Sequence, residues 1–224
     1  MPAQPRYLMV RPDFYDIEYT INPWMRGNLR RVDRALALEQ WEFFYRHLTQ
    51  AADVQVLEPV EGLPDMVFAA NGALALNGKA VPAVFRYPQR RDENPHFQAW
   101  LAAHDFEIHK LPETIYFEGV GDAIPDPSRN VLWAGYGVRS TLQAHGLVAR
   151  MLDVEVLPLR LVDERFYHLD TCFSVLDDGT AIYYPQAFDR PSLLAIERCV
   201  APEKRIEAST ADALKMACNA VEAG

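Results

Sequence analysis

The spacing of apolar residues along the chain predicts helices in five places. Residues 33–48 carry apolar side chains at helical intervals, and Asp33 is positioned to cap the amino end of that helix. The segment 140–152 has a similar pattern and opens on Ser140, which is also a suitable cap. The other segments with helical character are 94–105, 191–200 and 210–221.

Shorter apolar runs, rich in Val and aromatic residues, predict strands between these helices. Two hairpins are indicated, one turning at Asn77-Gly78 and one at Asp178-Gly179, because these dipeptides favour tight hairpin turns. The remaining strand predictions are 7–10, 54–60, 106–111, 117–126, 131–138 and 154–161.

The order of these elements, strands followed by a helix and another strand, recurs roughly every 50 residues. No linker, low-complexity tract or change of composition marks a domain boundary. The chain is therefore predicted to form a single mixed α/β domain over residues 1–224. The last predicted helix would normally lead into another strand, and none follows it, so the final unit is expected to be incomplete.

Composition excludes some classes of function without identifying one. With 224 residues, 50% of them hydrophobic and 24% charged, the chain is long enough to bury its own core. The net charge of −9 argues against nucleic acid or anionic membrane as a main partner, because neutralising phosphates requires clustered Lys and Arg. The sequence offers no apolar run suited to a membrane span, and its start, broken by Pro and charge, does not suit a signal peptide.

Cysteine usage points to a reducing compartment. Three cysteines, an odd number, do not suggest a disulfide framework, so the protein is expected to be cytoplasmic. No pair of Cys or His residues has the close spacing of a zinc site. The sequence therefore leads us to expect neither a metal nor a cofactor.

The stretch ERFYHLDTCFSVLDDG, residues 164–179, brings His168, Asp170 and Cys172 within five positions. Its aromatic and β-branched content predicts a strand, in which these side chains share a face. His168 and Cys172 would then lie roughly 13 Å apart, too far for the histidine to activate the thiol. Cys172, like the other two cysteines, is therefore expected to be structural. The His168–Asp170 pair is open to a structural role or an acid/base role.

Three further polar residues stand in apolar or glycine-rich surroundings. Glu118 precedes two glycines in FEGVGDAI, which suits a site and a plain turn equally well. Asp65 and Asn71 lie in GLPDMVFAANG, where buried polar groups are costly unless paired. They are candidates for binding a planar cation and equally for capping the ends of a strand. The residues alone thus indicate a pocket with acids, an amide and one histidine.

Several motifs together make the sequence resemble a known superfamily. In order along the chain, from about residue 8 to the last residue, they are RPDFYDIEYTINPWMRGN, GLPDMVFAANGAL, FEGVGDA, WAGYGVRS, ERFYHLDTCF and VAPEKRI. They resemble the amidinotransferase, dimethylarginine hydrolase and arginine deiminase superfamily, and within it the arginine dihydrolase modules of cyanobacteria. The resemblance implies an α/β pentein fold, with ββαβ units around a pseudo-fivefold axis, here with the last unit incomplete.

The resemblance also implies a mechanism, in which a Cys thiolate attacks the guanidinium carbon, ammonia leaves and water hydrolyses the adduct. His168 matches the general acid/base of this scheme, and Glu118 matches the acid that orients it. Arg90 and Arg139 match positions expected to bind a substrate carboxylate, which makes agmatine the least suitable substrate. The full set that matches substrate-binding positions is Asn22, Asp65, Asn71, Arg90, Arg139 and Asp170.

Two departures from the superfamily pattern matter. Hydrolases that release a single amine usually carry Asp where this chain has Asn71, and Asn there resembles dihydrolases, which convert arginine to ornithine. The nucleophilic cysteine of the superfamily lies in a GGAAKCLTL-like segment after the fifth unit's helix, and none of the three cysteines here matches it. The chain is thus expected to carry a substrate site without its attacking thiol, and to be inactive by itself.

Four functions are compatible with the sequence. They are hydrolysis of the guanidino group of arginine or a derivative such as dimethylarginine, amidino transfer, inactive binding of arginine-like ligands or a partner protein, and a scaffold without a site. The expected partner in the first two is a small guanidino molecule. An incomplete last unit would also expose a strand edge, which is expected to lower stability or to favour a homo-oligomer.

Overall fold

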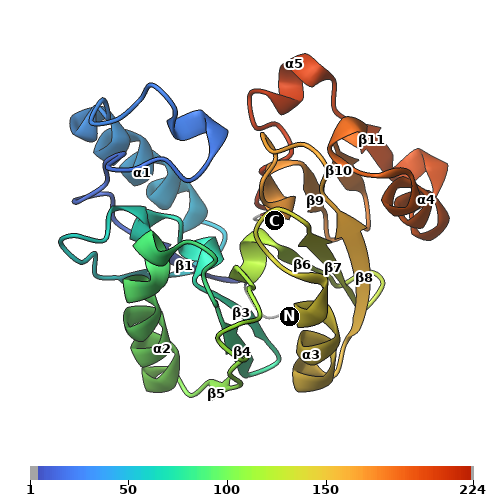
Figure 1. The fold of residues 1–224 in the computed structure, drawn as a ribbon, viewed down its shortest axis with the longest axis horizontal. Coiled ribbons are helices and arrows are strands. Elements are labelled where there is room, and N and C mark those ends of the chain that lie inside the picture. The colour runs from blue at the N-terminus through green and yellow to red at the C-terminus, as the bar shows by residue number, and fades with distance from the viewer. Residues whose placement is uncertain (1–4, 223–224) are drawn as a thin grey trace.

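In the computed structural model, which describes residues 5–222, one two-stranded and three three-stranded sheets carry helices on their outer sides (Figure 1). Each three-stranded sheet has the same order of elements. A hairpin is followed by a helix, and the chain then returns as a strand parallel to the second hairpin strand. These are ββαβ units, as the recurring sequence pattern predicts.

The first such unit turns at the predicted Asn77-Gly78 hairpin. Both residues have positive φ, as a tight hairpin turn requires. The last strand is shorter than the predicted 106–111, and it pairs parallel to the second strand of the hairpin. The elements of this unit are β3 (Ala73–Leu76), β4 (Lys79–Pro82), α2 (Asn94–Ala103) and β5 (Glu107–Ile108).

Two more ββαβ units follow along the chain. The second contains β6 (Ala123–Asp126), β7 (Val131–Tyr136), α3 (Leu142–Leu152) and β8 (Glu155–Arg160). The third contains β9 (Phe173–Val175), β10 (Ala181–Tyr183), α4 (Arg190–Cys199) and β11 (Arg205–Glu207). Its hairpin turns at the predicted position, with Gly179 at positive φ.

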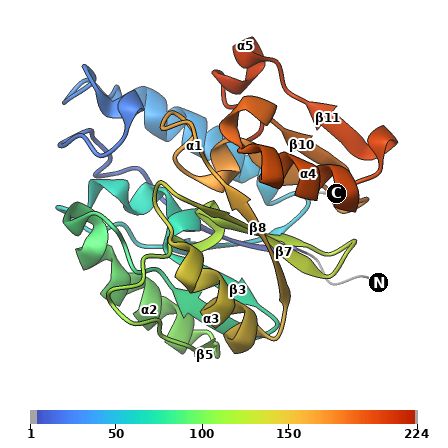
Figure 2. The ribbon, with the colours of Figure 1, turned by 45° about the vertical axis from the view of Figure 1, so that its right-hand side comes forward.

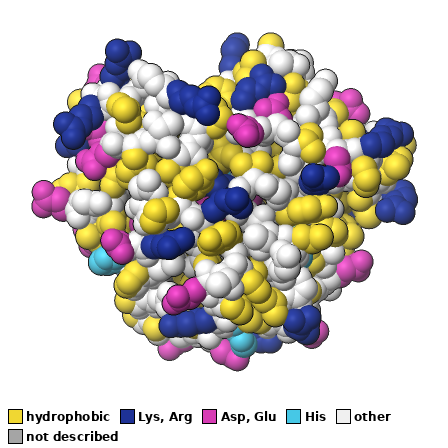
Figure 3. All heavy atoms as spheres, viewed as in Figure 1, with side chains coloured by type: hydrophobic (Ala, Val, Ile, Leu, Met, Phe, Trp, Pro, Cys, Tyr) yellow, Lys and Arg dark blue, Asp and Glu magenta, His cyan; other side chains and the backbone are white. Residues whose placement is uncertain are grey.

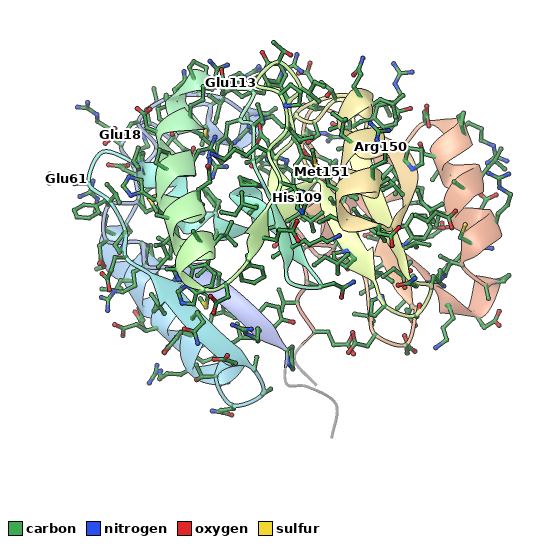
Figure 4. The ribbon with its side chains drawn as sticks, turned by 90° about the horizontal axis from the view of Figure 1, so that it is seen from below. Glu18, Glu61, His109, Glu113, Arg150 and Met151 are labelled. Carbon is green, nitrogen blue, oxygen red and sulfur yellow. The ribbon has the colours of Figure 1, made fainter. Side chains whose placement is uncertain are left out.

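The helices join neighbouring units. Helix α3 contacts β4 of the preceding unit as well as its own β8, and α4 contacts β8. Figure 2 shows α4 in front of the sheet that contains β10 and β11. Seen from below, His109, which follows β5, lies between α2 and α3, and Arg150 and Met151 lie on α3 (Figure 4). Each unit is therefore packed against the next rather than standing alone.

The amino-terminal part of the chain forms a smaller sheet. Strands β1 (Arg6–Val10) and β2 (Asp53–Leu57) pair parallel, with α1 (Arg34–Leu48) between them in the chain. The predicted cap is present, because the Asp33 side chain accepts a hydrogen bond from the Leu36 N–H at 3.0 Å. Helix α1 is less covered than its apolar pattern predicts: of its apolar side chains Leu48 is buried, while Phe44 is 46% exposed.

Three short turns of 3-10 helix recur at equal intervals. They span Ala69–Asn71, Gly119–Gly121 and Leu169–Thr171, so each begins 50 residues after the one before. Each turn directly precedes the first strand of a ββαβ unit, and consecutive turns contact one another. The repeat that the sequence suggests is thus regular in the structure, and its turns meet at one place.

Two predictions about helices differ from the structure. The helix expected over 210–221 is limited to α5 (Thr210–Ala213), because the chain turns at Met216, whose φ is 60°, and buries Cys218 in the core. Ser140 does not cap α3, which begins after Thr141. Its hydroxyl donates instead to Asp122 at 2.6 Å. In both places a tertiary contact overrides the local signal.

Candidate active site

One cavity of about 460 Å³ collects most of the residues that the sequence singled out. Seven of the eight line it: Asn22, Asp65, Asn71, Arg90, Arg139, His168 and Asp170. Glu118, the eighth, does not line the cavity, but its carboxylate contacts the imidazole of His168. Strand β1, helix α1 and Met216 line the other walls, and in the space-filling view the surface is notched between the α1 and α5 sides (Figure 3). A cavity of this size suits a ligand as large as an amino acid.

His168 lies between two carboxylates. Its Nε2 is 3.3 Å from Glu118 Oε2, and its Nδ1 is 3.1 Å from Asp122 Oδ2. These are bent ion-pair contacts rather than aligned hydrogen bonds, because neither ring N–H is directed at its oxygen. All three side chains are buried, so water screens the interaction only weakly.

Both carboxylates are held in place from their other sides. Glu118 accepts hydrogen bonds from a backbone N–H at 3.1 Å and from Arg139 Nη1 at 2.9 Å. Asp122 accepts from Ser140 Oγ at 2.6 Å and from the Leu169 N–H at 3.2 Å. Ser140 Oγ also accepts the Glu118 N–H at 3.0 Å, so a single hydroxyl is bonded to both ends of the short segment that carries the two acids.

These contacts shift the pKa values of His168 and Glu118 in opposite directions. Burial alone would lower the pKa of His168, but Asp122 and Glu118 outweigh it and raise that pKa to about 9. Burial would raise the pKa of Glu118, but the contact with His168 and the charge of Arg139 lower it to about 2. At neutral pH the pair is an imidazolium beside a carboxylate, the state that a general acid requires.

Asp65 and Asp170 bring two more carboxylates to the cavity. Asp65 Oδ2 accepts a hydrogen bond from the Tyr19 hydroxyl at 3.0 Å, whereas its buried Oδ1 has no partner within residues 5–222. Burial raises the pKa of Asp65, although Arg90 opposes this shift. Burial also raises the pKa of Asp170, to about 6. A bound cation with N–H groups would pair with both carboxylates and lower both pKa values.

Arg90 is buried and largely occupied by protein acceptors. Its Nε and Nη2 donate to the two carboxylate oxygens of Glu93, each at 2.8 Å. Its Nη1 donates to Asn71 Oδ1 at 2.8 Å, and Nη2 also donates to the Asp65 carbonyl oxygen at 3.1 Å. Four of the five N–H groups therefore have protein acceptors. Burial opposes its charge, but Glu93 outweighs burial and raises the pKa of Arg90.

Arg139 keeps more hydrogen-bonding capacity. Besides its contact with Glu118, it donates through Nη2 to the Ile21 carbonyl oxygen at 3.0 Å, while Nε has no acceptor among the described residues. Its guanidinium lies over the rings of Tyr87 and Tyr167, at 4.8 and 4.7 Å from their centroids. Both rings restrict where this cation can move.

Two asparagines border the same cavity. The Asn22 side chain accepts a hydrogen bond from the Met25 N–H at 3.1 Å and so caps the short turn that follows it. Asn219 Nδ2 donates to the Asp170 carbonyl oxygen at 3.1 Å. Asn219 thereby fixes the backbone that carries one of the cavity's acids.

None of the three cysteines lines the cavity. The strand predicted through Cys172 is wrong before residue 173, because the chain forms the turn Leu169–Thr171, which directs the Leu169 N–H to Asp122. Cys172 Sγ lies 3.5 Å from the Leu169 carbonyl oxygen, and burial raises the pKa of its thiol well above the ordinary value. Cys218 is also buried, and Cys199 is exposed on α4.

Sequence reasoning missed several members of this site. Asp122 stands four residues after Glu118 in FEGVGD, and that spacing was the available signal. Glu93 follows Arg90 by three residues, a spacing that lets two side chains pair across one turn. Asn219 was assigned to a helix, and nothing local indicates that it contacts Asp170.

The described residues form neither a metal cluster nor a membrane-spanning helix. Within residues 5–222, no group of three or more His, Cys, Asp or Glu side chains is arranged to hold a metal ion. Over the same part of the chain, no helix combines the length and the apolar character needed to cross a membrane.

A family model and two relatives of known name match nearly the whole chain. The family described as N,N dimethylarginine dimethylhydrolase, eukaryotic, matches residues 4–224. The bifunctional arginine dihydrolase/ornithine cyclodeaminase AgrE of Nostoc sp. is 48% identical over 221 residues, which are 99% of this chain and 31% of that protein. The N(G),N(G)-dimethylarginine dimethylaminohydrolase of Mycobacterium tuberculosis is 40% identical over 228 residues, covering 100% of this chain and 72% of that protein. The chain thus spans about a third of the bifunctional relative.

Solved structures place the fold in the same group. The N-terminal domain of ArgZ, a cyanobacterial arginine dihydrolase crystallised with its substrate, superposes with a TM-score of 0.96 at 47% identity, over 97% of this chain and 80% of that one. A dimethylarginine dimethylaminohydrolase at 17% identity shares the fold, with a TM-score of 0.74 over 95% of this chain and 79% of that one. The predicted pentein fold of ββαβ units is confirmed. With nearly all of its residues matched, the chain belongs to the N,N-dimethylarginine dimethylhydrolase family.

Proposed function

We propose that this chain carries the substrate site and the acid/base of a hydrolase that acts on the guanidino group of arginine or an arginine derivative. The observation that carries the proposal is the position of His168. Its imidazole is held between two buried carboxylates at the wall of a cavity that also contains Asp65 and Asp170. A proton donor and acceptors for a planar cation are thereby placed together.

The proposed ligand orientation follows from the charges that line the cavity. The free Oδ1 of Asp65 and the carboxylate of Asp170 accept N–H groups of the guanidinium. The carboxylate of the ligand lies toward Arg139, whose Nε has no acceptor among the described residues. Arg90 has fewer free donors, so its predicted contribution to carboxylate binding is limited to its one unengaged N–H.

The proposed reaction needs a thiol that this chain's cavity does not contain. A thiolate attacks the guanidinium carbon, the imidazolium of His168 gives its proton to the departing amine as ammonia, and the neutral imidazole then takes a proton from the attacking water. Because no cysteine of this chain lines the cavity, we place the nucleophile in a segment outside these 224 residues. We further propose dihydrolase chemistry yielding ornithine, which Asn71 and the likeness to AgrE and ArgZ support.

The experiment measures ammonia released from L-arginine, with citrulline and ornithine quantified, for this chain and for the natural open reading frame that contains it. We expect the full frame to produce ornithine and this chain to be silent while still binding arginine in calorimetry. H168Q in the full frame should abolish ammonia release, whereas the matched control H109Q, a histidine between α2 and α3, should not. Citrulline as the sole final product would contradict the dihydrolase proposal.

A second candidate is an inactive module that binds arginine-like ligands. The absence of any cysteine from the cavity lining favours it. Arginine binding by a full frame that releases no ammonia would support this candidate and contradict hydrolysis. Amidino transfer would instead give a new guanidino compound and little ammonia in the presence of an acceptor amine.

A further inference from the structure

Ser140 is a buried residue in the loop between β7 and α3, and it does not line the cavity. Hydrogen bonds of the backbone hold this loop in place. The Thr141 N–H donates to the Tyr116 carbonyl oxygen at 3.0 Å, and the Ser140 carbonyl oxygen accepts the Gly137 N–H at 3.1 Å. The Ser140 side chain therefore has a fixed position beside the segment that carries Glu118.

The hydroxyl of Ser140 has one direction in which to donate. Its oxygen accepts the Glu118 N–H at 3.0 Å, and Asp122 Oδ2 lies 2.6 Å from it. A hydroxyl carries a single hydrogen, and an ionised carboxylate can only accept. The hydrogen is therefore donated to Asp122, in a bond whose short length is typical of a charged acceptor.

This bond completes the restraint of the Asp122 carboxylate. Oδ2 is held by Ser140, and Oδ1 accepts the Leu169 N–H at 3.2 Å. Because both oxygens are held, the carboxylate cannot rotate without breaking a hydrogen bond. The oxygen that Ser140 holds is also the one that lies 3.1 Å from His168 Nδ1.

The restraint accounts for the geometry at His168. Its Nδ1 is close enough to Asp122 Oδ2 for a hydrogen bond, yet the ring N–H is not directed at that oxygen. A carboxylate that was free to rotate would turn to form an aligned, charge-assisted bond with the imidazolium. The Glu118 carboxylate is held in the same way, by a backbone N–H on Oε1 and by Arg139 on Oε2. His168 thus receives the charge of both acids, while neither ring N–H has an aligned acceptor among the described residues.

We propose that Ser140 is a positioning residue that holds the Asp122 carboxylate out of alignment with His168, so that the imidazolium keeps an N–H for the departing amine. This inference rests on the proposed function and deepens it, because it names a further residue that serves the same acid/base. An N–H that is bound to an aligned carboxylate gives up its proton less readily, since that hydrogen bond must also be broken. Ser140 acts through Asp122.

The first measurement is an NMR titration of the His168 ring protons in this chain. In S140A the Asp122 carboxylate loses its restraint and turns toward the imidazolium, so the pKa of His168 should rise by roughly 0.5–1 unit. A strongly downfield N–H resonance of the ring should accompany the rise, as the signature of an aligned bond. The variant leaves in place the other charged groups that act on His168 or on its partner Glu118, which are Asp122, Asp170, Arg90 and Arg139.

Two further variants separate the hydroxyl from general support of the loop. S140T keeps the hydroxyl, so it should restore the wild-type titration. T141V is the matched control, because it removes the neighbouring hydroxyl, which donates to the Tyr116 carbonyl oxygen at 3.2 Å and not to an acid. T141V should leave the pKa of His168 unchanged. A shift in T141V as large as that in S140A would overturn the inference.

Combining S140A with D122N shows whether Ser140 acts through Asp122. In the D122N background there is no carboxylate to release, so S140A should change the pKa of His168 by less than about 0.3 unit. An equal shift in both backgrounds, or a lower pKa of His168 in S140A alone, would overturn the inference. This comparison does not depend on S140T. If S140A does not fold, S140C, whose thiol is a weak donor, takes its place with the same expected direction.

The second measurement gives kcat and KM for L-arginine over a range of pH, using the natural open reading frame that contains this chain. S140A should lower kcat about tenfold near neutral pH, and the limb of the kcat profile that reports loss of the His168 proton should move to higher pH. KM should change by less than about twofold, because Asp65 and Asp170 are unaltered. A raised KM with unchanged kcat would overturn the inference. A full frame that releases no ammonia would count against the proposed function, and the titration would still decide whether Ser140 restrains Asp122.

Discussion

Asp122 is the residue whose effect on His168 can be tested most directly. D122N replaces one carboxylate oxygen by an amide nitrogen and removes a negative charge that lies 3.1 Å from His168 Nδ1. The variant keeps an acceptor for the Leu169 N–H, and its new NH2 group can donate to Ser140 Oγ, so the local structure should persist.

The size of the effect follows from the pKa of about 9 that His168 has between its two acids. One opposite charge at this distance shifts a pKa by about 1–3 units, so we expect His168 to titrate roughly 1–3 units lower in D122N. The pKa of His168 in the folded state exceeds the ordinary histidine value near 6.5. Its protonation therefore contributes its full stabilisation of the fold at pH values below about 6.5. This stabilisation, roughly 3 kcal/mol in the wild type, is lost as pH rises through about 9. D122N should therefore be less stable than the wild type near pH 6, and the difference should shrink above pH 9.

The assay is an NMR titration of the imidazole ring protons, with the His168 signals assigned by their loss in H168Q, together with urea unfolding at pH 6 and pH 9.5. The matched control is D126N, a buried carboxylate of the same unit that contacts Trp133 and Arg129 instead. D126N should lower stability without moving the pKa of His168. If D122N titrates within a few tenths of a unit of the wild type, the two-acid account of His168 is refuted.

Four other perturbations have defined outcomes. G121A places a methyl group 2.1 Å from Asn71 Nδ2 and should weaken arginine binding measured by calorimetry, with unchanged affinity contradicting the packing argument. Because the pKa of Asp170 is about 6 and the guanidinium needs its carboxylate form, arginine affinity should fall by up to about tenfold per pH unit below that pH; an identical pH profile in D170N would contradict this. E118Q leaves the buried Arg139 without its charged partner and should lower the free energy of unfolding in urea by roughly 3–5 kcal/mol, a loss under about 1 kcal/mol being inconsistent with the buried pair. Finally, the sheet of β1 and β2 has two strands where each of the other described sheets has three, so an open strand edge there should let the chain self-associate in size-exclusion chromatography; a monomer at all concentrations would count against the open edge.

Much of the fold could be predicted because its signals are local. Asp33 caps α1 through a bond three residues away, and Asn77-Gly78 sets its hairpin through its own backbone angles. The helix expected over 210–221 fails because Cys218 and Asn219 make contacts with distant parts of the chain, and no local pattern encodes those contacts.

The candidate site, too, could be predicted only in part. Its residues were found through motifs, and the structure brings seven of the eight to one cavity. Their partners were not found, because Asp122 faces His168 only once two units are packed together. The hydrogen bonds from Arg90 to Glu93 also limit how Arg90 can contribute to ligand binding, because N–H groups that donate to protein acceptors are not free to donate to a ligand.

The equal spacing of the turns Ala69–Asn71, Gly119–Gly121 and Leu169–Thr171 has a consequence for which sequence changes this chain can accept. Residues inserted at a hairpin tip, such as Asn77-Gly78, lengthen a loop and leave the pairing of the strands unchanged. One residue inserted between His168 and β9 would turn every following side chain of that strand to the opposite face. Homologous sequences should therefore vary in length at the tips and keep the length of the turns constant, and grafting one turn from a relative should change the chemistry of the cavity without rebuilding the sheets.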